Sequence, residues 1–338
     1  MKQKVDSESE QPFIIHPRSW SARLAERLTE PLHLNILAAF VKLFGSYTMK
    51  IDFDLIRPRH YAFAILEAAR FAQRQGVSTI TIIEFGVAMG KGLLAMCDIA
   101  KQVSRETGVQ FSVAGFDTGC GMPPPVDYRD HPDLYQAGDF PMNQEELARE
   151  LPPNARLVIG DIKHTVPGFL AELSPEQPIG FAAIDVDYYS SAVEALKIFS
   201  GPDPTKYLPL TLVYLDDIVL PSHSRFTGEL LAVEEFNQAN AMRKIDKYRF
   251  LRSQRIFKQP RWISQVFLLH VFDHPIMNTT KARQPKIYAD HPQRRRSRPY
   301  LISSIDQLLN DGWRSRRNHA SRQSRLVSQG AGQYKGSA

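Results

Sequence analysis

The sequence predicts an α/β fold with a doubly wound (Rossmann-like) sheet that is mostly parallel and ends in an antiparallel hairpin. After Gly76, five short apolar runs alternate with amphipathic helical stretches, a pattern typical of parallel strands covered on both faces. The runs are Thr79 to Ile83, Phe111 to Phe116, Ala155 to Ile159, Gly180 to Ile184 and Leu208 to Leu215. The helical stretches are Gly92 to Glu106, Gln144 to Glu150, Val166 to Glu172, Ala192 to Phe199 and Gly228 to Asn240.

Two further β-like segments, Lys247 to Phe257 and Trp262 to Phe272, follow these five units. Only the short connection Lys258-Gln259-Pro260 separates them, so we expect no helix between them and an antiparallel pairing at the end of the sheet. Five parallel strands followed by such a hairpin are the methyltransferase variant of the doubly wound fold. A dinucleotide dehydrogenase more often continues with another parallel crossover.

The chain divides into a predicted N-terminal helical arm or cap (1–76), the α/β domain (77–273) and a basic tail (274–338). Helical spacing at Ser19 to Thr29 and at Leu32 to Phe44 predicts a cap or a dimerisation arm, which makes a homo-oligomer one expectation. A third helix is predicted from Ile56 to Arg74, where alanines and larger apolar residues form one stripe.

Neither a secretory signal nor a membrane-spanning helix is predicted. The stretch from Pro31 to Tyr47 is interrupted by polar residues and is shorter than the roughly 20 residues that a spanning helix needs. We interpret it as a helix docked on the body, with an interfacial membrane helix as the alternative. The two cysteines, Cys97 and Cys120, do not suggest a disulfide framework, so we expect a reducing, cytoplasmic setting.

The net charge of +6 is unevenly distributed along the chain. From Lys281 onward there are 13 Lys or Arg and 3 acids, which leaves 29 basic and 33 acidic residues before that point. A basic tail of this kind is typical of segments that contact nucleic acid or other polyanions. One short helix, Ile302 to Leu309, is predicted within it.

The first predicted strand runs into a glycine-rich turn, in which Gly86, Gly90 and Gly92 follow Glu84. Glycine lets the backbone approach a ligand closely, and the helix that follows offers free N–H groups. The spacing G-x-x-x-G-x-G departs from the G-x-G-x-x-G of pyrophosphate sites, and Glu84 would repel a pyrophosphate. A carboxylate there suits a cationic ligand such as the aminoacyl and sulfonium portion of S-adenosylmethionine. An ordinary tight turn is the alternative.

Two more acids end neighbouring predicted strands. Asp117 is placed to accept both hydroxyls of a ribose, as acids do in other doubly wound nucleotide sites. Asp161 and Ile162 are placed to bond an adenine amine and to pack against its face, although Asp161 could equally be a helix N-cap. Acids at the carboxyl ends of adjacent parallel strands together predict a nucleoside-like ligand.

Four aspartates follow the fourth and fifth strands: Asp185 and Asp187, then Asp216 and Asp217. Like charges this close are costly unless a cation neutralises them, which predicts a divalent metal ion, Mg²⁺ above all. Such an ion would lower the pKa of a substrate hydroxyl and orient it. Alternatively, one of the first two aspartates caps the next helix while the second pair is solvated. The pattern leaves open whether Asp185 or Asp187 is the ligand.

A general base is needed to take the proton of the hydroxyl. His223, six residues after Asp217, is one candidate, and Asp187 is the other. A surface-loop histidine is the alternative interpretation of His223.

Taken together, these motifs resemble the macrocin O-methyltransferase family. The resemblance rests on Glu84-Phe85-Gly86-Val87, Gly115-Phe116-Asp117, Gly121-Met122-Pro123, Gly138-Asp139-Phe140-Pro141, Asp185-x-Asp187-x-Tyr189-Ser190-Ser191, Asp216-Asp217 and Ala232-Val233-x-x-Phe236. It covers roughly Arg57 to Asn240. It implies a class I methyltransferase that methylates sugar hydroxyls of natural products with Mg²⁺, with cofactor contacts at Glu84, Gly86, Gly90 and Asp117 and metal ligands among the four aspartates.

The family comparison also bears on two further segments. The insert Pro123 to Phe140 is expected to form a lid over the cofactor. Family members often carry an aromatic residue or a histidine just after the paired aspartates, whereas here Ile218 to Pro221 intervenes before His223.

Two functions follow from these observations. The first is an S-adenosylmethionine-dependent, Mg²⁺-assisted O-methyltransferase for a sugar-like or natural-product-like hydroxyl. The second is a nucleic-acid- or polyanion-binding protein that acts through the Arg-rich tail, although the tail has few aromatic residues for base stacking.

Overall fold

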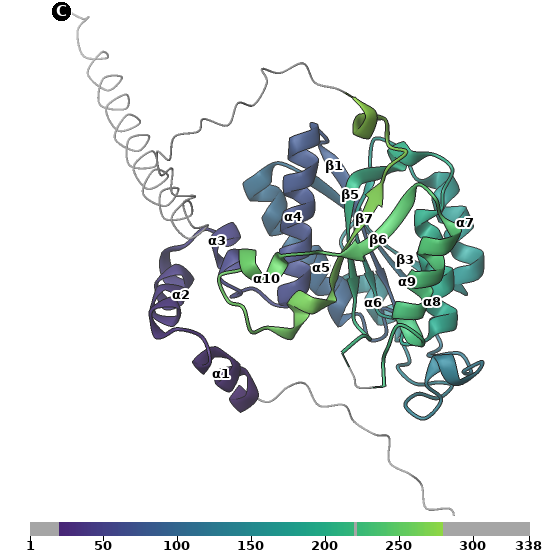
Figure 1. Cartoon of the computed structure of the whole chain (residues 1–338), viewed down its shortest axis with the longest axis horizontal. Helices are drawn as coiled ribbons and strands as arrows, with labels where there is room; N and C mark the ends of the chain where they lie inside the picture. The colour runs from purple at the N-terminus through teal and green to yellow at the C-terminus, as the bar shows by residue number, and fades with distance from the viewer. Residues whose placement is uncertain (1–19, 220–221, 280–338) are drawn as a thin grey trace, which may run out of the picture. The chain divides into compact units, whose positions relative to one another are not determined.

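Within residues 20–219 and 222–279, which the computed structural model describes, seven strands form one sheet in the order β3-β2-β1-β4-β5-β7-β6 (Figure 1). The strands are β1 (Thr79–Phe85), β2 (Gln110–Asp117), β3 (Ala155–Ile159), β4 (Ile179–Ile184), β5 (Tyr207–Leu215), β6 (Arg243–Lys247) and β7 (Val266–Val271). The first five are parallel, β7 is antiparallel to β5, and β6 is antiparallel to β7. The predicted fold class is confirmed.

Helices cover both faces of the sheet (Figure 1). On one face lie α4 (Arg59–Gln75) and α5 (Lys91–Thr107), and on the other α7 (Ile162–Glu172), α8 (Tyr189–Leu196) and α9 (Gly228–Ala239). The short α6 (Gln144–Glu150) precedes β3. All six residues of β4 are buried, because a parallel strand covered by helices on both sides has no solvent face. Two hydrophobic clusters, one on each side of the sheet, form the core.

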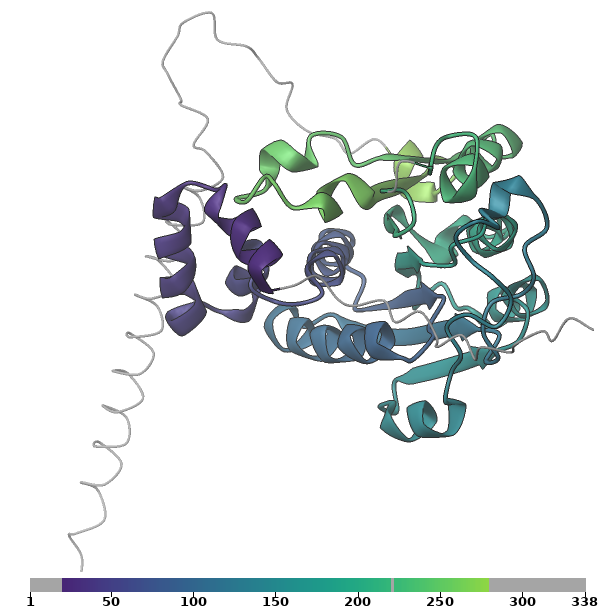
Figure 2. The same ribbon diagram turned by 90° about the horizontal axis from the view of Figure 1, so that it is seen from below.

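Three helices precede α4: α1 (Trp20–Leu28), α2 (Leu32–Phe44) and α3 (Tyr47–Asp52). The first two match the predicted spans, whereas α3 was not predicted. It begins at Ser46, whose hydroxyl accepts the N–H of Met49 at 3.2 Å. Seen from below, these helices lie beside α4 and α5, and α3 contacts both (Figure 2).

The predicted antiparallel hairpin exists, but its first strand and its connection were placed wrongly. The strand is β6 at Arg243–Lys247, and the following 18 residues hold the four-residue helix α10 (Leu251–Gln254) and a 3₁₀ turn at Arg261–Gln265. Side chains such as Ile256 and Phe257 are buried, yet not in a strand. In β6 itself only Arg243 and Ile245 are buried. The apolar residues on which the strand prediction rested lie in the connection that follows β6.

A buried ion pair ties this β6–β7 connection to the segment before α4. The Arg255 guanidinium donates to a carboxylate oxygen of Asp54 at 2.6 Å and to the carbonyls of Ile51 and Asp52 at 3.1 and 2.9 Å. The side chains of Arg255 and Asp54 are 6% and 1% exposed. The connection therefore holds in place the residues that lead into the first turn of α4.

In the part of the chain that the structure describes, no helix combines the length and the apolarity needed to cross a membrane. The predicted helix Ile302 to Leu309 and the proposed polyanion contact of the basic tail lie outside the described residues.

Replacing Arg255 with methionine leaves Asp54 buried without its cation, so we expect Arg255→Met to lower the free energy of unfolding by about 3–5 kcal/mol. Urea unfolding followed by circular dichroism measures the change. Arg249→Met is the matched control, because Arg249 and Asp246 form an exposed pair at 72% and 46% exposure near the same connection. Equal losses of unfolding free energy in the two variants would show that the buried Arg255–Asp54 pair does not stabilise the fold.

Candidate active site

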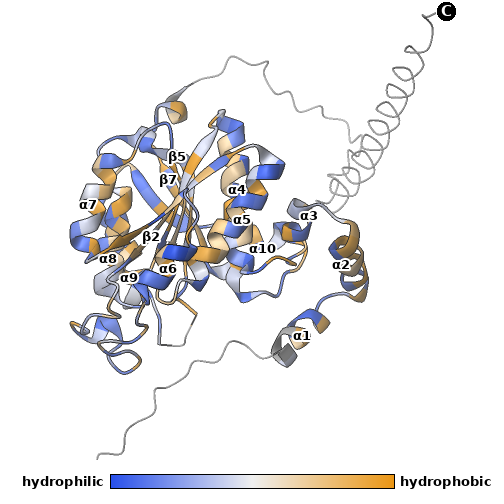
Figure 3. Cartoon of the chain, turned by 180° about the vertical axis from the view of Figure 1, so that it is seen from behind, coloured by the Kyte–Doolittle hydropathy of each residue, from blue (hydrophilic) through white to orange (hydrophobic). Residues whose placement is uncertain are grey.

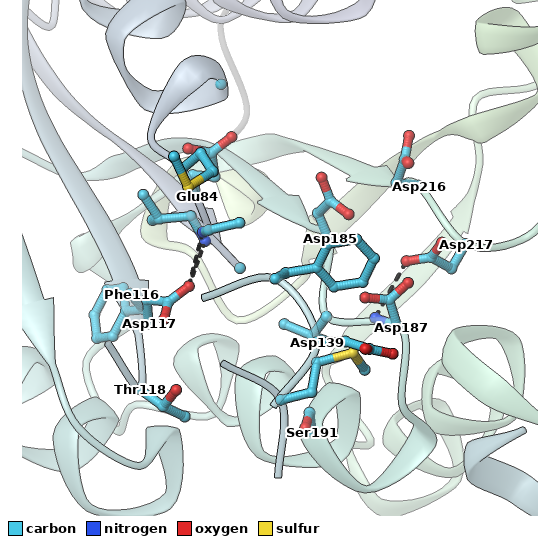
Figure 4. Close-up of a pocket in the computed structure, with 18 of the residues that line it drawn as sticks. Glu84, Phe116, Asp117, Thr118, Asp139, Asp185, Asp187, Ser191, Asp216 and Asp217 are labelled. Carbon is cyan, nitrogen blue, oxygen red and sulfur yellow. Dashed lines mark hydrogen bonds between the residues drawn. The ribbon is translucent and has the colours of Figure 1, made fainter. Parts of the chain in front are cut away.

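A cavity of about 680 Å³ opens at the carboxyl ends of the parallel strands. Its walls come from the loops after β1, β2, β4 and β5, from the first turn of α4 and from the insert between Pro123 and Phe140. Glu84 and Asp117 lie on one side, and the aspartates after β4 and β5 lie on the other (Figure 4). This is the edge at which open α/β sheets bind ligands, as the sequence predicts.

The turn after β1 is built so that glycine is required at Gly86. Its φ is +83°, and an added Cβ would lie 1.6 Å from the carbonyl oxygen of Asp185. The ends of β1 and β4 therefore touch through backbone atoms, which brings the glycine-rich turn beside the aspartates. Gly90, with φ +80°, is the N-cap of α5.

Glu84, the acid at the end of β1, is buried, and only one of its two carboxylate oxygens accepts a hydrogen bond from a described residue. The hydroxyl of Tyr61 donates to one carboxylate oxygen at 2.5 Å, while the other has no hydrogen-bond partner among the described residues. Burial raises the pKa of Glu84 to about 8. An added Cβ at Gly92 would lie 2.1 Å from this carboxylate, so the start of α5 leaves it no spare room. A buried acceptor of this kind suits a cationic donor.

Asp117, at the end of β2, is engaged by backbone groups. One carboxylate oxygen accepts the N–H groups of Val87 and Ala88, each at 2.9 Å, and the other accepts the N–H of Gly119 at 2.7 Å. Asp117 therefore holds the glycine-rich turn in shape. It also lines the cavity, so its predicted contact with ribose hydroxyls stays a proposal.

The structure separates Asp161 from Ile162. Asp161 is exposed and caps α7, its carboxylate accepting the N–H of Lys163 at 2.9 Å, and it is not among the residues that line the cavity. This is the helix-cap alternative of the sequence analysis. Ile162, one residue later, does line the cavity.

Three of the four predicted metal ligands converge. Carboxylate oxygens of Asp185, Asp216 and Asp217 lie within 4.8 Å of one another, and we call these three residues the carboxylate cluster (Figure 4). Burial, and then the Asp216 carboxylate, raises the pKa of Asp185 well above its ordinary value. Burial, and then the Asp187 carboxylate, does the same for Asp217. These carboxylates offer the oxygen donors that hard divalent cations take.

Asp187 lies beside the carboxylate cluster without being one of its three residues (Figure 4). It comes three residues after the end of β4 and has a φ of +59°, so the alternation of a strand no longer applies to it. Its backbone N–H donates to Asp217 at 3.2 Å, and its side chain is hydrogen-bonded with Asp217 and with Tyr135 of the insert. Burial raises the pKa of Asp187 to about 6.

His223 does not line the cavity. It is buried with its ring 4.5 Å from that of His131. Burial, and then His131, lowers its pKa. The predicted general base is thus packed against the insert.

Sequence reasoning missed two residues near the aspartates. His60, in the first turn of α4, lines the cavity and stacks on Tyr214 at 4.2 Å, and burial lowers its pKa to about 4. Glu229, in the first turn of α9, is fully buried and accepts the backbone N–H of Asp217 at 3.2 Å. His60 precedes the strands of the sheet in the sequence, and Glu229 resembles the acids that are common in the first turn of a helix. Nothing in the sequence therefore indicated that either residue lies near the aspartates.

The insert, predicted as a lid, is bound to the start of α8. The buried Asp130 accepts the N–H and the hydroxyl of Ser190, at 2.8 and 2.9 Å, at the start of α8. Beyond that anchor, Tyr135, Asp139 and Phe140 line the cavity. The segment thus supplies one wall.

No family model matches the chain, and no curated protein matches it. Among solved structures, the calicheamicin methyltransferase CalS11 is 22% identical, with 69% of this chain and 91% of that chain covered and a TM-score of 0.43. The O-methyltransferase NovP is 18% identical, with 54% and 72% covered and a TM-score of 0.39. An O-methyltransferase from Bacillus cereus in complex with SAH is 12% identical, with 70% and 87% covered and a TM-score of 0.32. The resemblance to the macrocin family stays a prediction.

Gly86→Ala tests the contact between the ends of β1 and β4. We expect it to destabilise the protein by clearly more than the about 1–3 kcal/mol that a left-handed backbone costs a non-glycine residue, because the methyl group also meets the Asp185 carbonyl. Gly108→Ala is the control, since Gly108 has a φ of +78° and nothing within 4 Å of an added Cβ. Urea unfolding of both variants measures the difference, and similar losses would contradict the steric contact.

Proposed function

We propose that the protein is an S-adenosylmethionine-dependent, Mg²⁺-assisted O-methyltransferase acting on a hydroxyl of a sugar-like or natural-product-like small molecule. The observation that carries the proposal is one cavity with a glycine-rich turn and a half-satisfied buried carboxylate on one side and the carboxylate cluster on the other. Its volume of about 680 Å³ lies in the range of small-molecule sites and leaves room for a cofactor and part of an acceptor.

The residues on the first side fit the cofactor. The free oxygen of Glu84 offers an acceptor for an ammonium group, and the open backbone of Gly86 and Gly90 admits a ligand at the turn. Asp117 lies next to them, with lone pairs left for ribose hydroxyls beside the N–H groups it already accepts. Ile162 offers an apolar surface to the adenine. We assign Asp161 to the cap of α7 and not to the cofactor.

The carboxylate cluster fits a hard divalent cation. Asp185, Asp216 and Asp217 would hold it, and Glu229 would support Asp217 from behind. When bound, Mg²⁺ supplies Lewis acidity that lowers the pKa of an acceptor hydroxyl. The protein's part is to hold that hydroxyl in line with the methyl group, which is the largest contribution a site of this kind offers.

Asp187 is the better candidate for the proton acceptor. It lines the cavity beside the cluster, where an acceptor hydroxyl would lie, whereas His223 does not line the cavity. The sugar-like substrate is supported by the resemblance to the macrocin family.

Calorimetric titration with S-adenosylhomocysteine, in Mg²⁺ and in EDTA, tests the cofactor. Micromolar binding in both conditions supports the proposal. If S-adenosylhomocysteine binds in neither condition, the proposed function is wrong and the glycine-rich turn is an ordinary βα connection.

Asp217→Asn separates the two halves of the cavity. We expect Mg²⁺ affinity, measured by calorimetry, to fall at least about tenfold because a charged ligand is lost, while S-adenosylhomocysteine affinity stays within about twofold. Asp203→Asn, at a half-buried turn cap outside the cavity lining, is the matched control and should change neither affinity. If Asp217→Asn also loses cofactor binding, Asp217 maintains the structure of the cavity instead of acting only as a metal ligand.

Glu84→Gln should show opposite effects on stability and binding. Burial raises the pKa of Glu84 from 4.5 to about 8, so its contribution to stability is complete below about pH 4.5 and is lost as pH rises through 8. A neutral amide avoids that loss. The unfolding free energy of the variant minus that of the wild type should therefore increase between pH 5 and pH 9. The affinity of the variant for S-adenosylhomocysteine should be lower than that of the wild type. A pH-independent difference would contradict the burial of a titrating carboxyl.

A further inference from the structure

The helix α2 is apolar on both of its sides. Leu34, Ala38 and Val41 are buried against the rest of the protein. On the opposite side Leu32, Ile36, Phe40, Leu43 and Phe44 are 53–73% exposed, and Figure 3 shows much of α2 in the hydrophobic colour. Lys42 is the one charged residue of this helix. A helix that is hydrophobic all round is normally buried.

Exposed leucines also lie on α1. Leu24 and Leu28 are 42% and 71% exposed, and the turn at residues 29–31 separates them from α2. We call Leu24, Leu28, Leu32, Ile36, Phe40, Leu43 and Phe44 the apolar stripe. At these exposures the seven side chains present on the order of 800 Å², which is what each partner of a standard protein–protein interface buries. Single apolar patches on monomers are usually smaller.

The stripe faces away from its own body because the polar side chains of α1 and the α1–α2 turn are bound to that body. Arg27 donates to the carbonyls of Phe53 and Asp54 at 3.0 and 2.9 Å. Glu30 accepts the N–H groups of Lys258 and Gln259 at 2.6 and 2.8 Å. The two helices are thereby held in one orientation, so docking a partner on the stripe requires little further ordering.

We propose that the apolar stripe is the interface through which the protein pairs with a second copy of itself. A two-fold arrangement sets the same stripe on both copies face to face, as a self-complementary interface requires. Phe40 and Phe44, whose ring centroids lie 4.9 Å apart, form an aromatic anchor within it.

Charge favours a second copy over a membrane surface. Helices that lie on membranes carry Lys and Arg on their polar face. Among the charged side chains of α1 and α2 that the structure describes, Lys42 stands alone on α2, Arg27 is bound to the body, and Glu26 is paired with Arg59. These described side chains offer anionic lipid little attraction.

Sedimentation equilibrium of the full chain between about 1 and 100 μM tests the proposal, and we expect a dimer with a dissociation constant of about 1 μM or tighter. Phe40→Glu places a charge in the centre of the stripe and should weaken the dimer at least about 30-fold. Ile36→Glu, a second exposed position on the same side, should do the same. Both variants should keep the circular dichroism spectrum of the wild type.

Phe226→Glu is the matched control, because Phe226 is 69% exposed and lies outside the stripe, so it should leave the dimer intact. A monomer at every concentration, or a dimer that both Phe40→Glu and Ile36→Glu leave unchanged, overturns the proposal. So does a monomeric wild type that co-sediments with phosphatidylcholine–phosphatidylserine vesicles and loses that property in Phe40→Glu, which would assign the stripe to a membrane surface.

Discussion

The backbone contact between the ends of β1 and β4 is the constraint on which the candidate site depends. At Gly86 the turn passes so close to the carbonyl of Asp185 that no side chain fits between them. The glycine-rich turn, which presents Glu84 and the start of α5, is therefore set beside the first aspartate of the carboxylate cluster. Asp117 completes the arrangement from the neighbouring strand by accepting the turn's N–H groups. The glycine-rich turn and the carboxylate cluster are thus held next to each other by backbone contacts.

These neighbouring carboxylates concentrate negative charge around one cavity. Burial raises the pKa values of Glu84, Asp185 and Asp217, because each ionised carboxylate has lost hydration and faces others. Such an arrangement lowers stability unless ligands neutralise it, and for this reason acids of this density are typical of binding sites. A cationic group beside Glu84 and a divalent ion at the cluster would remove the two largest sources of repulsion.

The segment before the sheet serves the site from outside it. The buried pair of Arg255 and Asp54 fixes the approach to α4, and the first turn of that helix brings His60 and Tyr61 into the cavity. Arg27 binds the carbonyl of the same Asp54, so α1 is attached at this point too. The helices that carry the apolar stripe are thereby connected to the wall of the cavity through a few polar contacts.

The alternation of apolar runs and helices was enough to predict the sheet, its parallel strands and the edge at which Glu84 and Asp117 meet, because parallel strands that are buried on both faces leave a continuous hydrophobic signal in the sequence. The same local patterns misplaced the hairpin, since the buried residues of the β6–β7 connection resemble a strand more than β6 does. Only the tertiary structure decided that Asp185 joins the carboxylate cluster while Asp187 lies beside it, and that His60 lines the cavity whereas His223 does not. These outcomes depend on loop conformations and on contacts between residues far apart in the chain, such as the left-handed backbone at Asp187, which no local periodicity encodes.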